Sequence, residues 1–239
     1  MMEAMQSHCL LNDMLHLKGD FMMTSLSNVS KRDKNGIISA SLLAGPKMSG
    51  KTSLLFEMAF HFAENGEYVL FIASKSYTKL PFFVNGREQP SSAVLKRIKI
   101  MYLTNYDDLI KYFANIPLSK ETTDEIANPC RHILVDDFDK YFQNNGGRFE
   151  DIKKLSKCIS YMVDALSFWK NSEKAMSSIL LVENTCENVL DHEKLSFYKH
   201  WIREYLFIQP SLGSLFQIQS MELEHSNECF SLSNKFLLH

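Results

Sequence analysis

Closely spaced cysteines are missing from this sequence of 239 residues. Its five cysteines stand far apart, their number is odd, and no Cys-x-x-Cys pair occurs. These absences argue against a disulfide framework and against a zinc site within the chain. We therefore expect a reducing compartment.

Long apolar runs and an excess of either charge are missing as well. No apolar stretch is long enough to cross a bilayer, and the first residues lack the basic start, apolar middle and small-residue cleavage site of a secretory signal. We expect no membrane contact and a cytoplasmic or nuclear location. Because 26 basic and 28 acidic residues nearly balance, any contact with nucleic acid must be local.

Strand and helix patterns alternate along most of the chain, without internal repeats. Residues 1–36 read as a flexible or partly helical segment, and residues 37–239 as one domain. Alternation implies an α/β fold whose mostly parallel, twisted sheet carries helices on both faces. The expected strands are 37–44, 68–73, 98–103, 132–135 and 178–182, the expected helices are 52–64, 91–96, 105–114 and 149–171, and a hairpin of 214–222 with 228–232 closes the chain.

One motif carries specific chemistry, because it fits the pattern G-x-x-x-x-G-K-[ST] completely and stands between an expected strand and an expected helix. Glycines let the loop backbone curl around phosphates, and the helix start offers free N–H groups. Lys51 should reach the β- and γ-phosphates, and the Thr52 hydroxyl should bind Mg²⁺. Lys47 adds charge or is simply solvated. The predicted site for ATP with magnesium is Gly45, Pro46, Lys47, Met48, Ser49, Gly50, Lys51 and Thr52.

A second, weaker signal is an apolar strand, residues 133–135, that ends in Asp136. An acid at that place can hold the water shell of magnesium opposite Thr52, so we assign Asp136 to the metal and to catalysis together with Lys51. Asp137 and Asp139 are neighbours that could be mistaken for it, and a surface acid at a strand end is the alternative reading.

Four segments, 43–56, 68–72, 95–100 and 134–141, follow one another within residues 37–185. Together they resemble a known group, the ATPase subunits of metazoan Shu-type complexes. These are small RecA-like recombinase paralogues that pair with SWIM-domain zinc proteins. It implies a RecA-like core with an ATP site, a nuclear location, and a role in homologous recombination DNA repair. It also implies that the complex promotes or stabilises recombinase filaments on single-stranded DNA.

The resemblance adds one site residue and one departure. Asn184 falls where RecA-like proteins place a polar sensor of the γ-phosphate, although an Asn that caps a loop is the alternative. Lys75 occupies the position at which these proteins carry a catalytic Glu after the second strand. A protonated lysine cannot act as a base toward water, so we expect a weak ATPase with tight binding and slow hydrolysis.

Partners and DNA contacts follow less directly. Basic residues gather at 96–99 and at 153–157, where they either contact phosphates or form solvated faces. The loop 183–193, which faces DNA in RecA-like proteins, is acidic here and argues against strong binding of DNA by this chain alone. We therefore expect a SWIM-domain zinc protein and recombinases as partners, and contact with single-stranded DNA through the complex.

Two other functions remain open at this point. The first is a phosphate-loop kinase of a small molecule or nucleotide, which would need several arginines in a lid, and the arginines are scattered. The second is a nucleotide-binding scaffold that does not hydrolyse its nucleotide, which Lys75 favours and intact Lys51 and Thr52 oppose. A GTPase is disfavoured because no Asn-Lys-x-Asp run occurs.

Overall fold

The computed structural model describes residues 39–78, 89–116, 130–142, 148–169, 178–184, 198, 201–202, 204–210, 216–222 and 232–238. The expected amino-terminal segment 1–36 lies outside these residues. No helix in the described ranges is long and apolar enough to span a bilayer.

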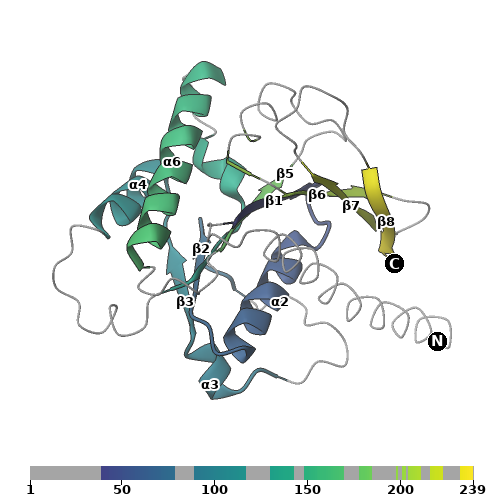
Figure 1. The fold of residues 1–239 in the computed structure, drawn as a ribbon, viewed down its shortest axis with the longest axis horizontal. Coiled ribbons are helices and arrows are strands. Elements are labelled where there is room, and N and C mark those ends of the chain that lie inside the picture. Colours follow the sequence, from purple (N-terminus) through teal and green to yellow (C-terminus); the bar gives the residue numbers. More distant parts are fainter. Residues whose placement is uncertain are drawn as a thin grey trace.

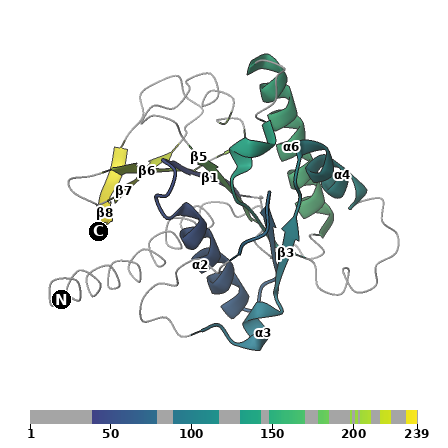
Figure 2. The ribbon, with the colours of Figure 1, turned by 180° about the vertical axis from the view of Figure 1, so that it is seen from behind.

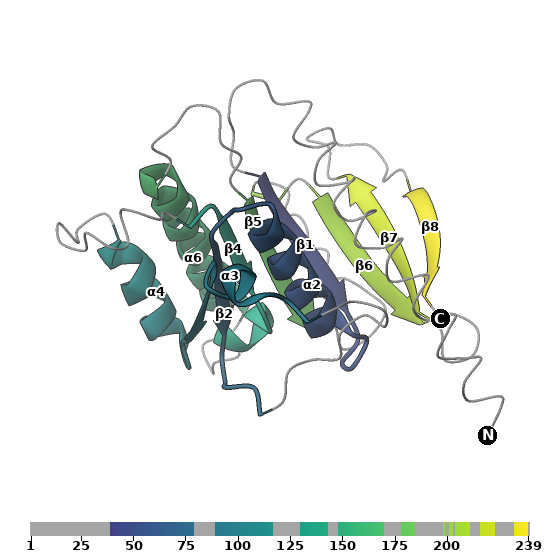
Figure 3. The same cartoon turned by 90° about the horizontal axis from the view of Figure 1, so that it is seen from below.

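In the described residues, eight strands form one sheet with the order β3-β2-β4-β5-β1-β6-β7-β8 (Figure 1). The six strands from β3 to β6 run parallel, and β7 and β8 add to the edge in antiparallel pairing (Figure 3). The α/β prediction with a mostly parallel sheet is confirmed, and this part of the chain is compatible with a RecA-like core. The strands are β1 (Ser39–Gly45), β2 (Val69–Ala73), β3 (Ile98–Tyr102), β4 (His132–Val135), β5 (Ser178–Asn184), β6 (Glu204–Pro210), β7 (Phe216–Glu222) and β8 (Leu232–Leu238).

Helices cover both faces of the sheet, as predicted. Helices α4 and α6 pack on one face and α2 and α3 on the other, which the front and rear views show together (Figures 1 and 2). The helices are α2 (Lys51–Glu64), α3 (Ser92–Leu95), α4 (Tyr106–Asn115) and α6 (Arg148–Trp169), and a 3-10 turn, η1 (Phe138–Phe142), follows β4.

The central strands are buried on both sides because their side chains alternate between two apolar clusters. In β2, Leu70 and Ile72 join the cluster under α4 and α6, whereas Val69 and Phe71 join the cluster under α2. All four are fully buried. Continuous apolar strands of this kind are typical of a parallel sheet between two helix layers.

Three details of the sequence prediction were wrong. Strand β6 was not predicted, although its apolar stretch 205–208 pairs in parallel with β1 and lies in the core. Strand β5 continues two residues further than expected, to Asn184, because it keeps its register with β1 up to Gly45. The hairpin exists, but its second strand continues to residue 238, beyond the expected end at residue 232, and residues 228–231 lie outside the described part.

The amino-terminal edge of the sheet is anchored by a buried imidazole. His132, the first residue of β4, stacks on Phe62 with ring centroids 3.7 Å apart. Its Nδ1 lies 2.7 Å from Ser178 Oγ, and its Nε2 lies 2.9 Å from Glu67 Oε2. Burial on its own would raise the pKa of Glu67, but the hydrogen bond and charge of His132 lower it below the ordinary value of 4.5. This contact joins α2, β4 and β5 at the edge opposite the phosphate loop.

The lowered pKa of Glu67 predicts a pH-dependent contribution to stability. Because the carboxylate is a better acceptor than the neutral acid, Glu67→Gln should reduce the free energy of unfolding by about 1 kcal/mol at pH 7. A lowered pKa in the folded state means that the advantage of the wild type is complete above pH 4.5 and disappears as pH falls through the folded value. Urea denaturation at several pH values measures it. An unchanged effect of Glu67→Gln in a His132→Phe background would show that the carboxylate does not act through the imidazole.

Candidate phosphate and magnesium site

The predicted phosphate loop lies at the junction of β1 and α2, at the carboxyl edge of the parallel strands. Its two glycines are needed for different reasons. Gly50 has a φ of 82°, a left-handed conformation that disfavours a side chain. Gly45 is instead required by close packing, since a Cβ there would come within 2.8 Å of Ile208 Cβ and 3.0 Å of the Ile208 carbonyl oxygen on β6.

The start of α2 lacks the groups that normally neutralise a helix amino terminus. Its N-cap residue is Gly50, no side chain caps it, and its first turn contains no acidic residue. Helix α4 differs on each of these points, because Asn105 accepts a hydrogen bond from the Asp108 N–H at 2.9 Å, and Asp107 and Asp108 lie in its first turn. The uncapped start of α2 leaves N–H groups and a partial positive charge for an anion.

Lys51 is buried and folds back over the loop. Its ammonium group donates to the Gly45 carbonyl at 3.1 Å, to the Pro46 carbonyl and to Ser49 Oγ at 3.3 Å. Burial lowers the pKa of Lys51, while the carboxylates of Asp136, Asp137 and Asp139 oppose that shift. Lys51 therefore lies inside the loop, where its ammonium group can exchange the carbonyl oxygens for phosphate oxygens as hydrogen-bond acceptors.

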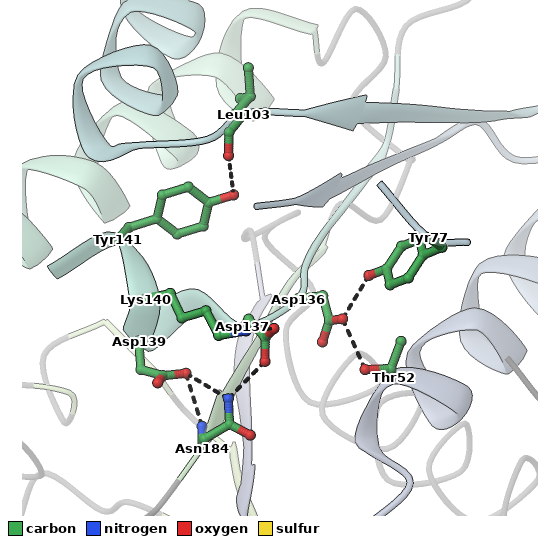
Figure 4. Close-up of polar contacts among 9 residues, drawn as sticks. All are labelled: Thr52, Tyr77, Leu103, Asp136, Asp137, Asp139, Lys140, Tyr141 and Asn184. Carbon is green, nitrogen blue, oxygen red and sulfur yellow. Dashed lines mark hydrogen bonds and ion pairs between the residues drawn. The ribbon is translucent and has the colours of Figure 1, made fainter. Parts of the chain in front are cut away.

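The predicted metal pair is brought together by the fold. Thr52 Oγ1 donates to Asp136 Oδ2 at 2.9 Å, across 84 positions of sequence (Figure 4). Asp136 directly follows β4, and β5 lies between β4 and β1. A second hydroxyl, that of Tyr77, donates to the same oxygen at 2.6 Å. Sequence analysis missed Tyr77, whose only signal is that it follows β2, a strand whose carboxyl end points to the same edge.

The other oxygen of Asp136 fits a cation. Asp136 is 3% exposed, and its Oδ1 is buried without a hydrogen-bond partner among the described residues. Burial raises the pKa of Asp136, and the hydrogen bonds from Tyr77 and Thr52 act against that shift. The described residues contain no group of three or more His, Cys, Asp or Glu side chains that could hold a metal by themselves. One carboxylate and one hydroxyl suit Mg²⁺, which usually keeps waters and takes phosphate oxygens as further ligands.

Asn184 lies beside the loop but is engaged with acids. As the last residue of β5 it pairs in register with Gly45. Its side-chain amide donates to Asp137 Oδ1 at 2.7 Å and to Asp139 Oδ1 at 3.2 Å, and its backbone N–H donates to Asp139 Oδ1 at 3.0 Å (Figure 4). A contact with a γ-phosphate would therefore require the amide group to leave these carboxylates. Its role as a sensor stays a prediction.

The acids around Asn184 are held by η1. Asp137 has a φ of 50°, which turns the chain sharply after β4, and it pairs with Lys140. The Tyr141 hydroxyl donates to the Leu103 carbonyl at 2.9 Å and fixes η1 against the end of β3 (Figure 4). Burial alone would raise the pKa of Asp137, but hydrogen bonds from Lys140 and Asn184 lower it.

The structure changes two other readings of the sequence. Glu183 is not part of an exposed acidic loop, since it lies in β5, is 3% exposed and accepts a hydrogen bond from Tyr198. Residues 185–193 lie outside the described part. Lys75 is exposed, and its charge contributes to lowering the pKa of Asp137. Tyr77, and not residue 75, contacts Asp136 from this side.

The basic clusters have partners within the chain. Arg97 donates to the Ala63 and Ala93 carbonyls at the ends of α2 and α3. Lys154 and Lys157 each lie 5.8 Å from the centroid of a tyrosine ring, Tyr106 and Tyr161 respectively. These contacts favour a structural role over a phosphate-binding role for the three side chains.

A groove of about 260 Å³ lies away from the phosphate loop, between α2, α3 and β3. Its lining is mostly apolar, and neither the loop nor Asp136 belongs to it. It is therefore separate from the phosphate site. The lining residues are Phe56, Phe60, Gln89, Pro90, Leu95, Ile98 and Ile100.

The contacts of Asn184 predict the effect of one isosteric substitution. Asn184→Asp replaces an amide donor by a third carboxylate beside Asp137 and Asp139, and should reduce the free energy of unfolding by about 1–3 kcal/mol at pH 7. Repulsion raises the pKa of the new acid in the folded state, so the penalty should shrink as pH falls and the carboxylates become protonated. Urea denaturation at pH 7 and at pH 4 measures the free energy of unfolding of Asn184→Asp and of the wild type. Equal stability of variant and wild type at pH 7 would contradict these contacts.

Comparison with known proteins assigns no family. No protein-family model matches the chain, and no curated protein matches it. We therefore infer the function of the chain from the geometry of the loop, from the contact between Thr52 and Asp136, and from the resemblance of the sequence segments.

Proposed function

We propose that this chain binds ATP as its magnesium complex on the loop between β1 and α2. The observation that carries the proposal is the hydrogen bond from Thr52 to Asp136, at the end of a loop whose glycines and uncapped helix start suit phosphate. A chance match of the motif would not bring an acid from a distant strand to the threonine. The arrangement of the loop and the acid therefore supports a magnesium nucleotide as the ligand.

Each residue would have one task. The backbone N–H groups of the loop and α2 would cradle the phosphates, and Lys51 would give up its carbonyl partners to contact the β- and γ-phosphates. Thr52 and Asp136 would hold magnesium, which neutralises charge on the phosphate oxygens. Because the Thr52 hydroxyl already points its proton at Asp136 Oδ2, its lone pairs are available to the metal.

The proposed biological role is that of a RecA-like recombinase paralogue. The chain would act in homologous recombination in the nucleus, in a complex with a SWIM-domain zinc protein that promotes or stabilises recombinase filaments on single-stranded DNA. The resemblance of segments 43–56 and 134–141 supports this, and the sheet order is compatible with it. The net charge of −2 and the engaged basic side chains favour DNA contact through the complex.

A second candidate function is a scaffold that binds but does not hydrolyse its nucleotide. It is favoured because a phenol, and not a second carboxylate, reaches Asp136 from the segment after β2. A kinase is less well supported. The two arginines whose side chains are described, Arg97 and Arg131, immediately precede β3 and β4 and so lie at the edge opposite the phosphate loop.

Binding is tested by titrating the purified chain with ATP and magnesium in a calorimeter. We expect binding by the wild type and at least about tenfold weaker binding by Lys51→Ala, because a charge-assisted contact to phosphate is lost. Lys96→Ala is the charge-matched control, since Lys96 is an exposed lysine outside the loop. Absence of binding by the folded wild type, or equal binding by the wild type and Lys51→Ala, would overturn the proposed function.

Hydrolysis should be slow even when the nucleotide is bound. Because the described segment after β2 offers a phenol and a lysine but no carboxylate base, we expect a rate about 10²–10⁴ lower than that of an enzyme with such a base. Single-turnover hydrolysis of labelled ATP with excess protein measures it. A rapid rate that Lys51→Ala abolishes would show that another group serves as the base and would refute the scaffold.

A further inference from the structure

Tyr77 joins the candidate metal site to the apolar core. It lies in the segment after β2, and its hydroxyl donates to Asp136 Oδ2 at 2.6 Å (Figure 4). Its ring packs edge-on against Phe56 at 5.4 Å, Phe71 at 6.2 Å and Tyr102 at 6.4 Å between centroids. Aromatic contacts from α2, β2 and β3 therefore fix the ring, and with it the position of the phenol oxygen.

The hydrogen bond of Tyr77 acts on one oxygen of Asp136 and leaves the other available. Oδ2 accepts from Tyr77 and from Thr52, which uses both of its lone-pair directions. Oδ1 is buried and has no hydrogen-bond partner in the described part of the chain. A carboxylate held at Oδ2 by two hydroxyl groups from different elements cannot rotate freely, so Oδ1 keeps one orientation.

Few side chains hold the carboxylate. Its neighbour Asp137 is also an acid, and repulsion between the two adds to the cost of burying Asp136, although a hydrogen bond from the Asp137 backbone acts in the opposite direction. Thr52 supplies one hydroxyl donor, which is also the proposed ligand of the metal. Among the described side chains that donate to Asp136, Tyr77 is the one that does not have to bind the cation itself.

We propose that Tyr77 is a positioning residue of the magnesium site: its hydroxyl orients Asp136 so that Oδ1 would be presented to the magnesium complex beside Thr52. This inference rests on the proposed function. It assigns a task to a residue that no phosphate-loop pattern contains. It also gives a reason for the phenol beside Asp136. Lys75, at the position where a catalytic base was expected, is exposed.

The test separates the hydroxyl from the ring. Tyr77→Phe keeps the aromatic contacts with Phe56 and Phe71 and removes only the donor. ATP affinity is measured by calorimetry at one pH, with magnesium and with excess EDTA, and the ratio of the two dissociation constants gives the magnesium enhancement. Tyr102→Phe is the matched control, because it removes a phenol hydroxyl from the same aromatic cluster without touching Asp136.

We expect Tyr77→Phe to reduce the magnesium enhancement about three- to tenfold, the change that loss of one hydrogen bond produces. Its affinity in EDTA should stay within about twofold of the wild type, and Tyr102→Phe should keep the full enhancement. A merely structural tyrosine would weaken binding equally in both conditions. Equally weakened binding of Tyr77→Phe with magnesium and with EDTA would overturn the assignment. An unchanged or increased magnesium enhancement would overturn it as well.

Two further readouts separate the possible failures. If the wild type binds ATP with a clear magnesium enhancement and Lys51→Ala does not bind, the proposed function stands, and the result for Tyr77→Phe decides the inference alone. If the folded wild type binds no nucleotide, both are refuted.

Far-ultraviolet circular dichroism and thermal unfolding without nucleotide check that Tyr77→Phe is folded. Should it not be, Tyr77→Leu, which keeps an apolar side chain and has no hydrogen-bond donor, is expected to lose the same part of the enhancement, and full enhancement there would refute the assignment.

Discussion

The hydrogen bond between Thr52 and Asp136 is the constraint on which the site depends. It exists only because β1, β5 and β4 lie side by side in parallel register, so that their carboxyl ends meet at one edge. The same register places Asn184 opposite Gly45. Moving β4 by one residue would turn Asp136 to the other face of the sheet, because side chains alternate along a strand. The apolar clusters on both faces therefore fix the chemistry as well as the fold.

Charges in the site oppose one another in a way that a magnesium phosphate would resolve. Burial disfavours the charged forms of both Lys51 and Asp136, lowering the pKa of the first and raising that of the second. A phosphate would stabilise the ammonium group, and a metal ion would stabilise the carboxylate. Asp137 belongs to a different network, because Lys140 and Asn184 already satisfy it. Three neighbouring acids are thus divided between one that can take a metal and two that shape the turn around it.

Tyr77 shows how the core reaches the site. Its ring belongs to the aromatic packing under α2, while its hydroxyl lies in the polar site. We assign the residue neither a purely structural role nor phosphate binding. It lies just after β2, at the carboxyl edge of the sheet. The segment after β2 therefore contributes a phenol to the site, whereas Lys75, two residues earlier, is exposed.

The sequence by itself determined the alternation of strands and helices, the phosphate loop and the acid after β4, because these depend on local periodicity and on residues that are close in the chain. Only the tertiary structure decided that β6 pairs with β1, that Glu183 is buried, that Asn184 is held by Asp137 and Asp139, and that Tyr77 contacts Asp136. Each of these depends on which strands become neighbours. Strand order is set by packing between distant segments, which no local pattern records.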